Sequence, residues 1–217
     1  MDSARHACSI AYCRGVRWDR LFEDLEGQLA SEWEAERAAL DSESERLRLS
    51  RLPLQERLRM LAQRPAAVPS AFELTDGTVL VAQVTAVGAD WAGLDAVGGG
   101  GGAALLPLVA VTTIGLPLTD ALASARPDGS SPRPRLAERM SLGFVLRDLA
   151  RRRVPVTIHV VGGRALSGTI DRALHDHLDI ALHDPGAPRR SADVTGVRVV
   201  PFGAVAWVRL DAAAVLA

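Results

Sequence analysis

The chain has 217 residues, of which 48% are hydrophobic, and its formal net charge is −1. A hydrophobic fraction of this size supports a packed core and excludes a chain that is disordered throughout. The near-zero charge excludes a surface that is basic everywhere, although it allows a local basic patch.

The two cysteines, Cys8 and Cys13, lie close to the N-terminus. The rest of the chain therefore cannot build a disulfide framework or a cysteine-based zinc site. The N-terminus lacks the apolar segment of a signal peptide, and no run of about 18 apolar residues could span a membrane. We therefore expect a cytoplasmic protein with no membrane partner. Residues 1–15 show no hydrophobic periodicity, so we expect them to be a non-native extension of a protein that starts at Val16.

Residues 17–50 are predicted to form one long helix, because large apolar residues recur at steps of three, four or seven. Glu36 interrupts this apolar stripe, and the opposite face is charged. Two interpretations remain open: a solvated helix that packs on its own domain, or a coiled-coil arm for dimerisation or docking. The candidate oligomerisation residues on the stripe are Trp18, Phe22, Leu25, Leu29, Trp33 and Leu40.

A short amphipathic helix is predicted at 52–64, where Pro53 suits the first helical turn. The hydrophobic pattern then changes to a period of two, which is typical of strands. Around Gly77 the sequence Thr-Asp-Gly-Thr predicts a hairpin turn between two such strands. The glycine run at 98–102 predicts a flexible loop, and 104–114 predicts one bent strand or a strand pair.

Prolines, glycine and serines at 117–134 predict a linker. A third helix is predicted at 135–153, and a period of two returns after it. A loop is predicted at 185–196, and the chain closes with strands at 197–210.

The two halves of the chain resemble each other, which indicates an internal repeat. A shift of 86 residues places Asp90 on Asp176 within the strand segments. The shift is 88 for the preceding helices and 94 for the last strands, where Pro107 falls on Pro201. Each half is thus predicted to be a helix followed by about five short strands, which favours a small bent sheet that closes on itself.

The segments "GGRALSGTIDRALHDHLDIAL" and "VVPFGAVAWV" resemble the small β-barrels of the Sm-like and SH3-like group. The pattern of that group maps onto Gly163, Gly168, Ile170, Asp176 and Asp179. This chain has an aspartate at the last position, where asparagine is usual, so the fold carries over better than the RNA-binding pocket. The resemblance implies an α+β fold with a long N-terminal helix followed by two tandem small Sm-like/SH3-like β-barrels, each preceded by a helix.

From "VRWDRLFEDLEGQLA" to its end, the chain also resembles an uncharacterised actinobacterial family whose members are often labelled Fis-family transcriptional regulators. All 25 basic residues are arginine, and there is no lysine or asparagine, which indicates a GC-rich genome. A Fis-type helix-turn-helix needs two consecutive helices joined by a short turn. The C-terminal region alternates as strands instead, so the residues do not support that label, and the resemblance implies no activity.

These patterns predict the following organisation: an extension at 1–15, a helical arm at 16–64, a first barrel at 65–116, a linker at 117–134, a helix at 135–153, a second barrel at 154–210 and a tail at 211–217.

The segment "HDHLDIALHD" at 175–184 is the one metal candidate in the sequence. His175, His177 and Asp179 alternate along a predicted strand and so share one face, a geometry that zinc accepts. The first half has no histidine or aspartate at the three corresponding positions. This favours an exposed polar strand set by the fold, with a partner or nucleic-acid contact and a metal site as the alternatives. We expect no metal and no other cofactor.

The sequence contains no nucleophile elbow, P-loop or dinucleotide-binding fingerprint. We therefore expect a protein that is not an enzyme.

Charge is unevenly distributed along the chain. Residues 65–132 hold one arginine against six acidic residues, whereas residues 133–217 hold thirteen arginines against eight acidic residues. The basic second half is predicted to contact nucleic acid, with RNA favoured over DNA. Arginines at a helix end also stabilise the helix dipole, which is the alternative interpretation. The candidate nucleic-acid-binding residues are Arg147, Arg151, Arg152, Arg153, Arg164, Arg172, Arg189 and Arg190.

Two functional hypotheses follow. The first is a non-enzymatic binding protein that contacts nucleic acid through its second half. The alternative is a protein-interaction or scaffold protein that forms a homodimer, or docks on a protein partner, through the N-terminal helix.

Overall fold

The computed structural model describes residues 7–64, 68–98, 102–125, 136–185 and 189–210. The chain divides into two compact units, Met1–Arg51 and Leu52–Ala217.

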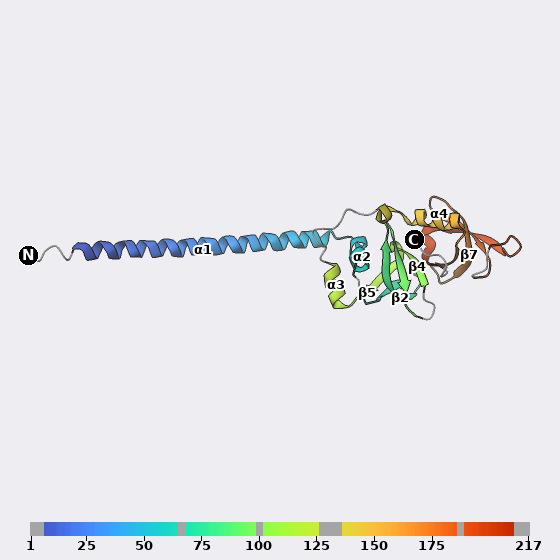
Figure 1. Cartoon of the computed structure of the whole chain (residues 1–217), viewed down its shortest axis with the longest axis horizontal. Helices are drawn as coiled ribbons and strands as arrows, with labels where there is room; N and C mark the ends of the chain where they lie inside the picture. Colours follow the sequence, from blue (N-terminus) through green and yellow to red (C-terminus); the bar gives the residue numbers. More distant parts are fainter. Residues whose placement is uncertain (1–6, 65–67, 99–101, 126–135, 186–188, 211–217) are drawn as a thin grey trace, which may run out of the picture. The chain divides into compact units, whose positions relative to one another are not determined.

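The first unit consists of a single helix, α1 (Ala7–Ser50), which runs without a break over 44 residues (Figure 1). The helix predicted at 17–50 is thereby confirmed, and it begins earlier than predicted. Ion pairs between Glu43 and Arg46 and between Glu45 and Arg48 lie one turn apart on its surface and add to its helix propensity. No helix among the described residues is long and apolar enough to cross a membrane.

The second unit has an α+β fold. Its helices are α2 (Leu54–Ala62), α3 (Leu118–Ser124) and α4 (Leu142–Arg152), with short 3-10 turns η1 (Leu108–Ala110), η2 (Leu136–Arg139) and η3 (Phe202–Ala204). Its strands are β1 (Ser70–Leu74), β2 (Val79–Val87), β3 (Trp91–Ala96), β4 (Gly102–Pro107), β5 (Val111–Gly115), β6 (Pro155–Val160), β7 (Ala165–Ala173), β8 (His177–Leu182), β9 (Gly196–Pro201) and β10 (Val205–Leu210).

The ten strands form one antiparallel sheet in the order β5-β1-β2-β3-β4-β10-β6-β7-β8-β9. The sheet is open, and its outer strands are β5 and β9. The long N-terminal helix and the α+β class were predicted from the sequence, but the pairing is one continuous sheet rather than two separate closed barrels. Helix α2 packs on β2, and α4 packs on β7.

The hairpin predicted around Gly77 is confirmed. Asp76 accepts hydrogen bonds from the backbone N–H and the hydroxyl group of Thr78, each at 2.9 Å. Gly77 has a φ of +82°, a conformation that glycine adopts without a steric penalty. Part of the segment predicted as a linker is helical instead, because α3 lies within it; residues 126–135 of that segment are outside the described residues.

Strand pairing follows the same register in the first half (α2 to β5) and the second half (α4 to β10). Phe72 of β1 lies opposite Leu80 of β2. Ile158 of β6 lies opposite Leu166 of β7, and both residues are 86 positions further along the chain. The register of β2 with β3 shifts after Val84, and that of β7 with β8 shifts 86 residues later.

Two hydrophobic cores lie in the second unit, one for each half, and each contains residues of the other half. The core of the first half includes Ala206 and Trp207 from β10. The core of the second half includes Trp91 from β3 and Leu105 from β4. Neither core is therefore complete without residues of the other half.

This exchange follows from the pairing of β4 with β10, where Leu105 lies opposite Val208. Side chains alternate between the two faces of a strand, so Leu105 enters the second core while its neighbour Leu106 enters the first. A register shift in β10 between Val205 and Trp207 marks a bulge. Bulges re-aim side chains, which explains why two consecutive residues of β10 face the first core.

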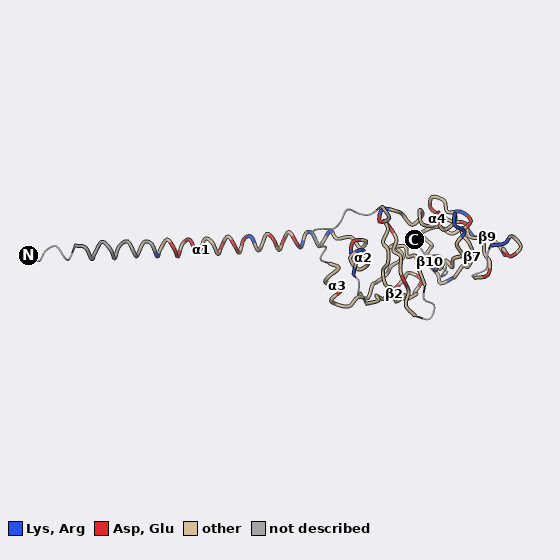
Figure 2. The backbone as a smooth tube through the Cα atoms, in the orientation of Figure 1, with Lys and Arg blue, Asp and Glu red and all other residues tan. Residues whose placement is uncertain are grey.

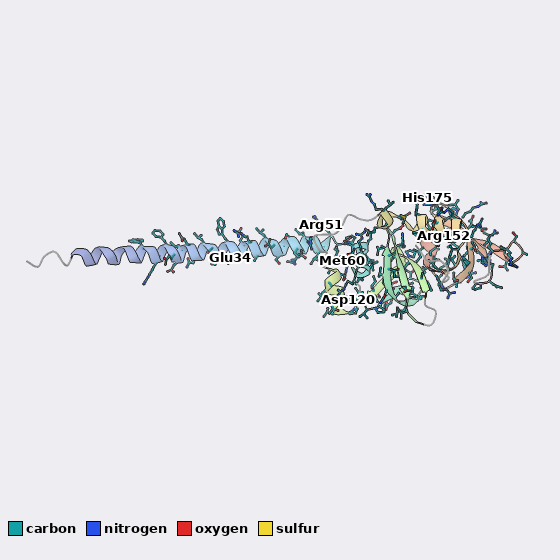
Figure 3. All side chains as sticks on the ribbon, viewed as in Figure 1. Glu34, Arg51, Met60, Asp120, Arg152 and His175 are labelled. Atoms are coloured by element: carbon teal, nitrogen blue, oxygen red, sulfur yellow. The ribbon has the colours of Figure 1, made fainter. Side chains whose placement is uncertain are left out.

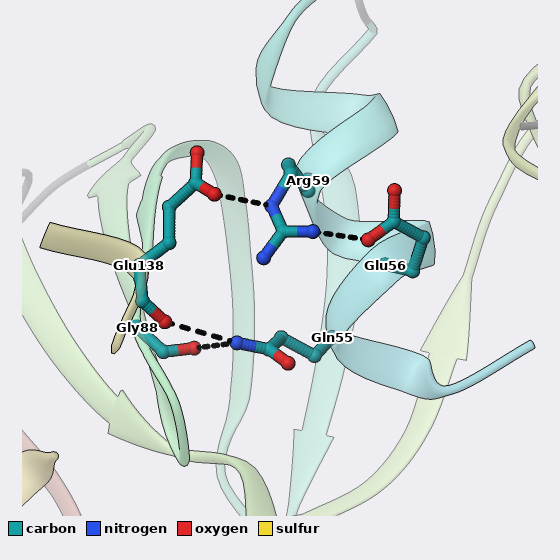
Figure 4. Close-up of polar contacts among 5 residues, drawn as sticks. All are labelled: Gln55, Glu56, Arg59, Gly88 and Glu138. Atoms are coloured by element: carbon teal, nitrogen blue, oxygen red, sulfur yellow. Dashed lines mark hydrogen bonds and ion pairs between the residues drawn. The ribbon is translucent and has the colours of Figure 1, made fainter. Parts of the chain in front are cut away.

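Polar contacts also join the halves, at the turn between β2 and β3 (Figure 4). The amide of Gln55 in α2 donates to the carbonyl groups of Gly88 and Glu138, at 2.6 and 3.2 Å. Arg59 of the same helix forms ion pairs with Glu56 and, at 3.1 Å, with Glu138. Together these contacts tie α2, the β2–β3 turn and the segment before α4 to one another.

The same turn holds the start of α4. The Asp90 carboxylate accepts the backbone N–H of Leu142, the first residue of α4, at 2.6 Å. The indole N–H of Trp91 donates to the carbonyl of Met140 at 2.9 Å. A carboxylate at this position satisfies a free N–H group and interacts favourably with the helix dipole.

Replacing Leu105 with alanine is expected to lower the free energy of unfolding by about 2–5 kcal/mol, because it leaves a cavity where the two halves meet. Urea denaturation monitored by tryptophan fluorescence measures this change. Val109→Ala serves as the control, since Val109 is 78% exposed and its truncation opens no cavity. A loss for Leu105→Ala no larger than that of the control would show that this contact does not hold the halves together.

His159 of β6 is partly buried against Trp207 of β10. The ring of His159 stacks on that of Trp207, with centroids 3.8 Å apart and planes 10° apart. Nε2 of His159 and Nε1 of Trp207 are buried and have no hydrogen-bond partner among the described residues. Burial lowers the pKa of His159 below its usual value of 6.5; Asp76 opposes this shift and Arg209 adds to it.

Because the folded-state pKa of His159 is lowered, the unfolded chain binds more protons, and stability falls as the pH drops below about 6.5. We expect His159→Phe, which keeps a stacked ring but cannot be protonated, to lose less stability than the wild type between neutral and mildly acidic pH. Urea denaturation over this pH range compares the two proteins. If the free energy of unfolding changes equally with pH in the two proteins, His159 does not contribute to the pH dependence.

Candidate interaction surfaces

Side chains project from α1 along its described length (Figure 3), and those of its apolar stripe are exposed. Large hydrophobic side chains that are rarely left in water project from it. The six predicted oligomerisation residues are 44–64% exposed: Trp18 59%, Phe22 57%, Leu25 44%, Leu29 56%, Trp33 64% and Leu40 64%.

The stripe repeats every 11 residues. Trp18, Leu29 and Leu40 are separated by 11, as are Phe22 and Trp33. Eleven residues over three turns give 3.67 residues per turn, so the stripe stays almost parallel to the axis of a straight helix. Leu25, Glu36 and Leu47 are also 11 residues apart, so Glu36 places a charge at a position of the repeat that is otherwise apolar.

Charge is also distributed unevenly along α1. Residues 19–36 hold seven acidic side chains and one arginine, whereas residues 37–51 hold three acidic side chains and four arginines. Figure 2 shows the acidic positions in red and the basic positions in blue. The two ends of the helix are therefore electrostatically complementary.

Four of the candidate nucleic-acid-binding arginines pair with carboxylates. Arg151 and Arg152 pair with Asp148, at 2.5 and 3.7 Å. Arg153 and Arg189 both pair with Asp171, at 2.8 and 2.7 Å. Each aspartate offsets one of the two positive charges, so a net positive charge remains at both pairs.

Asp171 joins two parts of the second half that are separate in the sequence. It lies on β7 and contacts Arg153 at the end of α4 and Arg189 in the β8–β9 loop. Partial burial works against its ionisation, but the hydrogen bond and charge of Arg189 and the charge of Arg153 outweigh it and lower the pKa of Asp171. We call the arginines at the end of α4 and in the β8–β9 loop the arginine rim: Arg151, Arg152, Arg153, Arg189 and Arg190. Figure 2 shows basic positions in both places in blue.

The remaining candidates are placed differently. Arg147 of α4 donates to the carbonyl of Leu174 at 3.1 Å. Arg164, Arg172 and Arg190 are exposed and have no carboxylate partner among the described residues. Arg164 belongs to the β6–β7 turn and Arg172 to β7, so they are not part of the arginine rim.

The histidine-rich segment divides between surface and interior. His175 is exposed, and Nδ1 of His177 contacts the Asp176 carboxylate at 2.7 Å, a hydrogen bond that lowers the pKa of Asp176. His183 is buried and its Nε2 contacts the Thr169 hydroxyl at 2.8 Å. Among the described residues, no group of three or more His, Cys, Asp or Glu side chains is arranged to hold a metal ion.

Three structurally important residues were not singled out from the sequence as contacts: Asp171, Gln55 and Glu138. Each contacts residues remote in the sequence, so no local pattern distinguishes it. Asp90 was matched with Asp176 in the comparison of the two halves, but its contact with α4 was not predicted.

Comparison of the chain with protein-family models, curated proteins and solved structures gives no match.

Proposed function

We propose that this chain is a non-enzymatic protein-interaction protein that dimerises through α1, with a second copy of α1 as the partner. The observation that carries the proposal is the exposed apolar stripe, which includes two tryptophans. A helix that buried no apolar face would have no physical reason to repeat large apolar residues every 11 positions over three repeats.

The charges of α1 favour an antiparallel pair. A parallel pair in register would place the acidic segment 19–36 beside the same segment of the partner. An antiparallel pair places it beside residues 37–51, where arginines outnumber acidic residues. Opposite charges flanking an apolar seam set the orientation of paired helices.

The similar registers of the two halves support a further part of the proposal, that the halves are copies of one small module of the Sm-like kind. In this proposal the second unit is a paired module that α1 brings together with a second paired module.

The double substitution Leu29→Glu and Trp33→Glu is expected to weaken dimerisation by about 100-fold or more, because it removes two large apolar contacts and adds charges to the seam. Analytical ultracentrifugation over a range of concentrations measures the dissociation constant. Ser31→Glu with Ala38→Glu adds the same charges to the opposite face and is the matched control. Equal dissociation constants for the two variants would reject the stripe as the dimer contact.

Glu36→Leu is the complementary variant, since it completes the stripe without removing a contact. It is expected to tighten the dimer by about tenfold. Glu34→Leu makes the same change on the opposite face and should leave the dissociation constant unchanged. Tightening by both variants alike would indicate nonspecific association.

A second candidate function is nucleic-acid binding at the arginine rim. The observation that favours it is the double contact of Asp171, which brings the end of α4 and the β8–β9 loop together with a net positive charge. The phosphate backbone of RNA or DNA is the ligand that such a rim suits.

Fluorescence anisotropy with labelled single-stranded RNA and duplex DNA over a salt series tests this function. Binding through the rim predicts an affinity that falls steeply with salt. Replacing Arg151, Arg152 and Arg190 with glutamine should reduce both the affinity and the salt slope, while leaving the Asp171 contacts intact. The corresponding lysine variants keep the positive charge and should therefore keep the affinity and the salt slope of the wild type. No binding at low salt, or binding unaffected by the glutamine variants, would reject this site.

A further inference from the structure

The pairing of β4 with β10 forms the internal joint between the two halves. The strands that correspond to β4 and β10 lie at the two ends of the sheet. With a shift of 94 residues, β4 corresponds to β9, and β5 corresponds to β10. Within the described part of the chain, β5 and β9 each have one partner strand. The two outer strands of the sheet are thus the counterparts of the two strands that pair in the joint.

On β9, side chains that correspond to buried side chains of β4 are exposed. Leu105 is fully buried in the joint, whereas its counterpart Val199 is 64% exposed. Val197 on the same strand is 52% exposed. An edge strand with exposed valines is a template for strand pairing.

Beside β5, the counterparts of residues that share a core with Leu105 form an open groove. In the second half, Leu105 shares a core with α4 and β10 residues. The counterparts of six of those residues are Leu54, Leu58, Leu61, Val111, Ile114 and Leu116. All six line one groove of about 370 Å³ between α2 and β5.

The difference in burial shows what the groove lacks. Leu142 of α4 is 5% exposed in the filled core, whereas its counterpart Leu54 is 41% exposed. Val208 is fully buried beside Leu105, whereas its counterpart Ile114 is only partly buried.

The hydrogen bond that holds the start of α4 has no equivalent between the counterparts of its two residues. The Asp90 carboxylate caps the first residue of α4, and the counterpart of Asp90 is Asp176, whose side chain is 78% exposed. The counterpart of the α4 start is Leu54, the first residue of α2, and the N-cap residue of that helix, Pro53, makes no side-chain hydrogen bond to it. The Asp176 carboxylate and the start of α2 lie at the ends of the sheet that carry β9 and β5 respectively.

We propose that β9 of one molecule pairs with β5 of a second copy of this chain and repeats the internal joint between molecules. The joint sets the register: Leu105 lies opposite Val208, and Ala104 lies opposite Arg209. The same register places Val199 opposite Ile114 of the second copy. The Val199 side chain then fills the groove between α2 and β5.

The contact joins two different surfaces, so it leaves one β5 edge and one β9 edge free in any open assembly. Such head-to-tail contacts close into rings or extend as filaments, depending on the rotation between copies. The contact does not involve α1 and therefore does not rest on dimerisation through that helix.

Disulfide trapping in the full chain tests the register. Cys8 and Cys13 are first replaced with serine, and a Val199→Cys protein is mixed with an Ile114→Cys protein under mild oxidation. The expected product is a disulfide between the two proteins, identified by mass spectrometry of the linked peptides. Val197→Cys mixed with Ile114→Cys is the matched control, because its partner positions are two residues out of register.

Directly opposed residues lie within disulfide range, whereas positions two residues out of register exceed it, so trapping should be about tenfold more efficient for the predicted pair. Equal trapping of the two pairs at the highest soluble concentration would overturn the proposal. Adding Leu29→Glu and Trp33→Glu to both proteins should leave the trapping unchanged, which separates this contact from α1.

Light scattering after size-exclusion chromatography provides the second measurement. The wild type is expected to exceed the mass of a dimer, and Val199→Lys should reduce the assembly, because a lysine at the edge blocks strand pairing. Val161→Lys places the same charge on an exposed valine in the β6–β7 turn, away from both outer strands, and should leave the mass unchanged. An assembly mass that Val199→Lys does not change would also overturn the proposal.

Discussion

The pairing of β4 with β10 is the contact on which the second unit depends. It makes one sheet out of two five-stranded halves, and alternation along these strands directs side chains into both cores. Leu105 fills the second core and Trp207 fills the first, so each half completes the other. A small domain buries a smaller share of its surface than a large one, and the exchange of side chains adds to the apolar surface that each half buries.

The polar contacts around the β2–β3 turn reinforce the same joint from outside the sheet. Gln55, Asp90 and Trp91 all contact the segment between Glu138 and Leu142. These hydrogen bonds satisfy backbone groups before and at the start of α4, and they fix where that helix begins. The apolar joint and the polar turn thus position α4 on the second core together.

The two ends of the sheet and the stripe of α1 present the same physical problem, which is apolar surface left in water. On α1 the problem concerns side chains alone, because the backbone of a helix satisfies its own hydrogen bonds. At β5 and β9 it concerns backbone groups as well as side chains. We propose that each of the two surfaces is covered by a further copy of the chain, independently of the other.

Much of the fold could be predicted from local patterns. The hydrophobic period of α1, the hairpin at Gly77 and the strands of both halves depend on neighbouring residues, and their spacing indicates them directly. The helix α3 was missed because its short apolar sequence lies among prolines and glycines that are typical of a linker. The rim arginines were identified as basic positions, but their pairing with Asp148 and Asp171 was not predicted.

The sequence by itself determined the long helix, most of the shorter elements with their order, and the matching patterns of the two halves, because these follow from local spacing. Only the tertiary structure decided that the halves share one open sheet, that Leu105 and Trp207 cross into each other's core, and that Asp171 links Arg153 with Arg189. These contacts join residues far apart in the chain, and the choice between closing each half and joining the two depends on strand edges that meet only after folding.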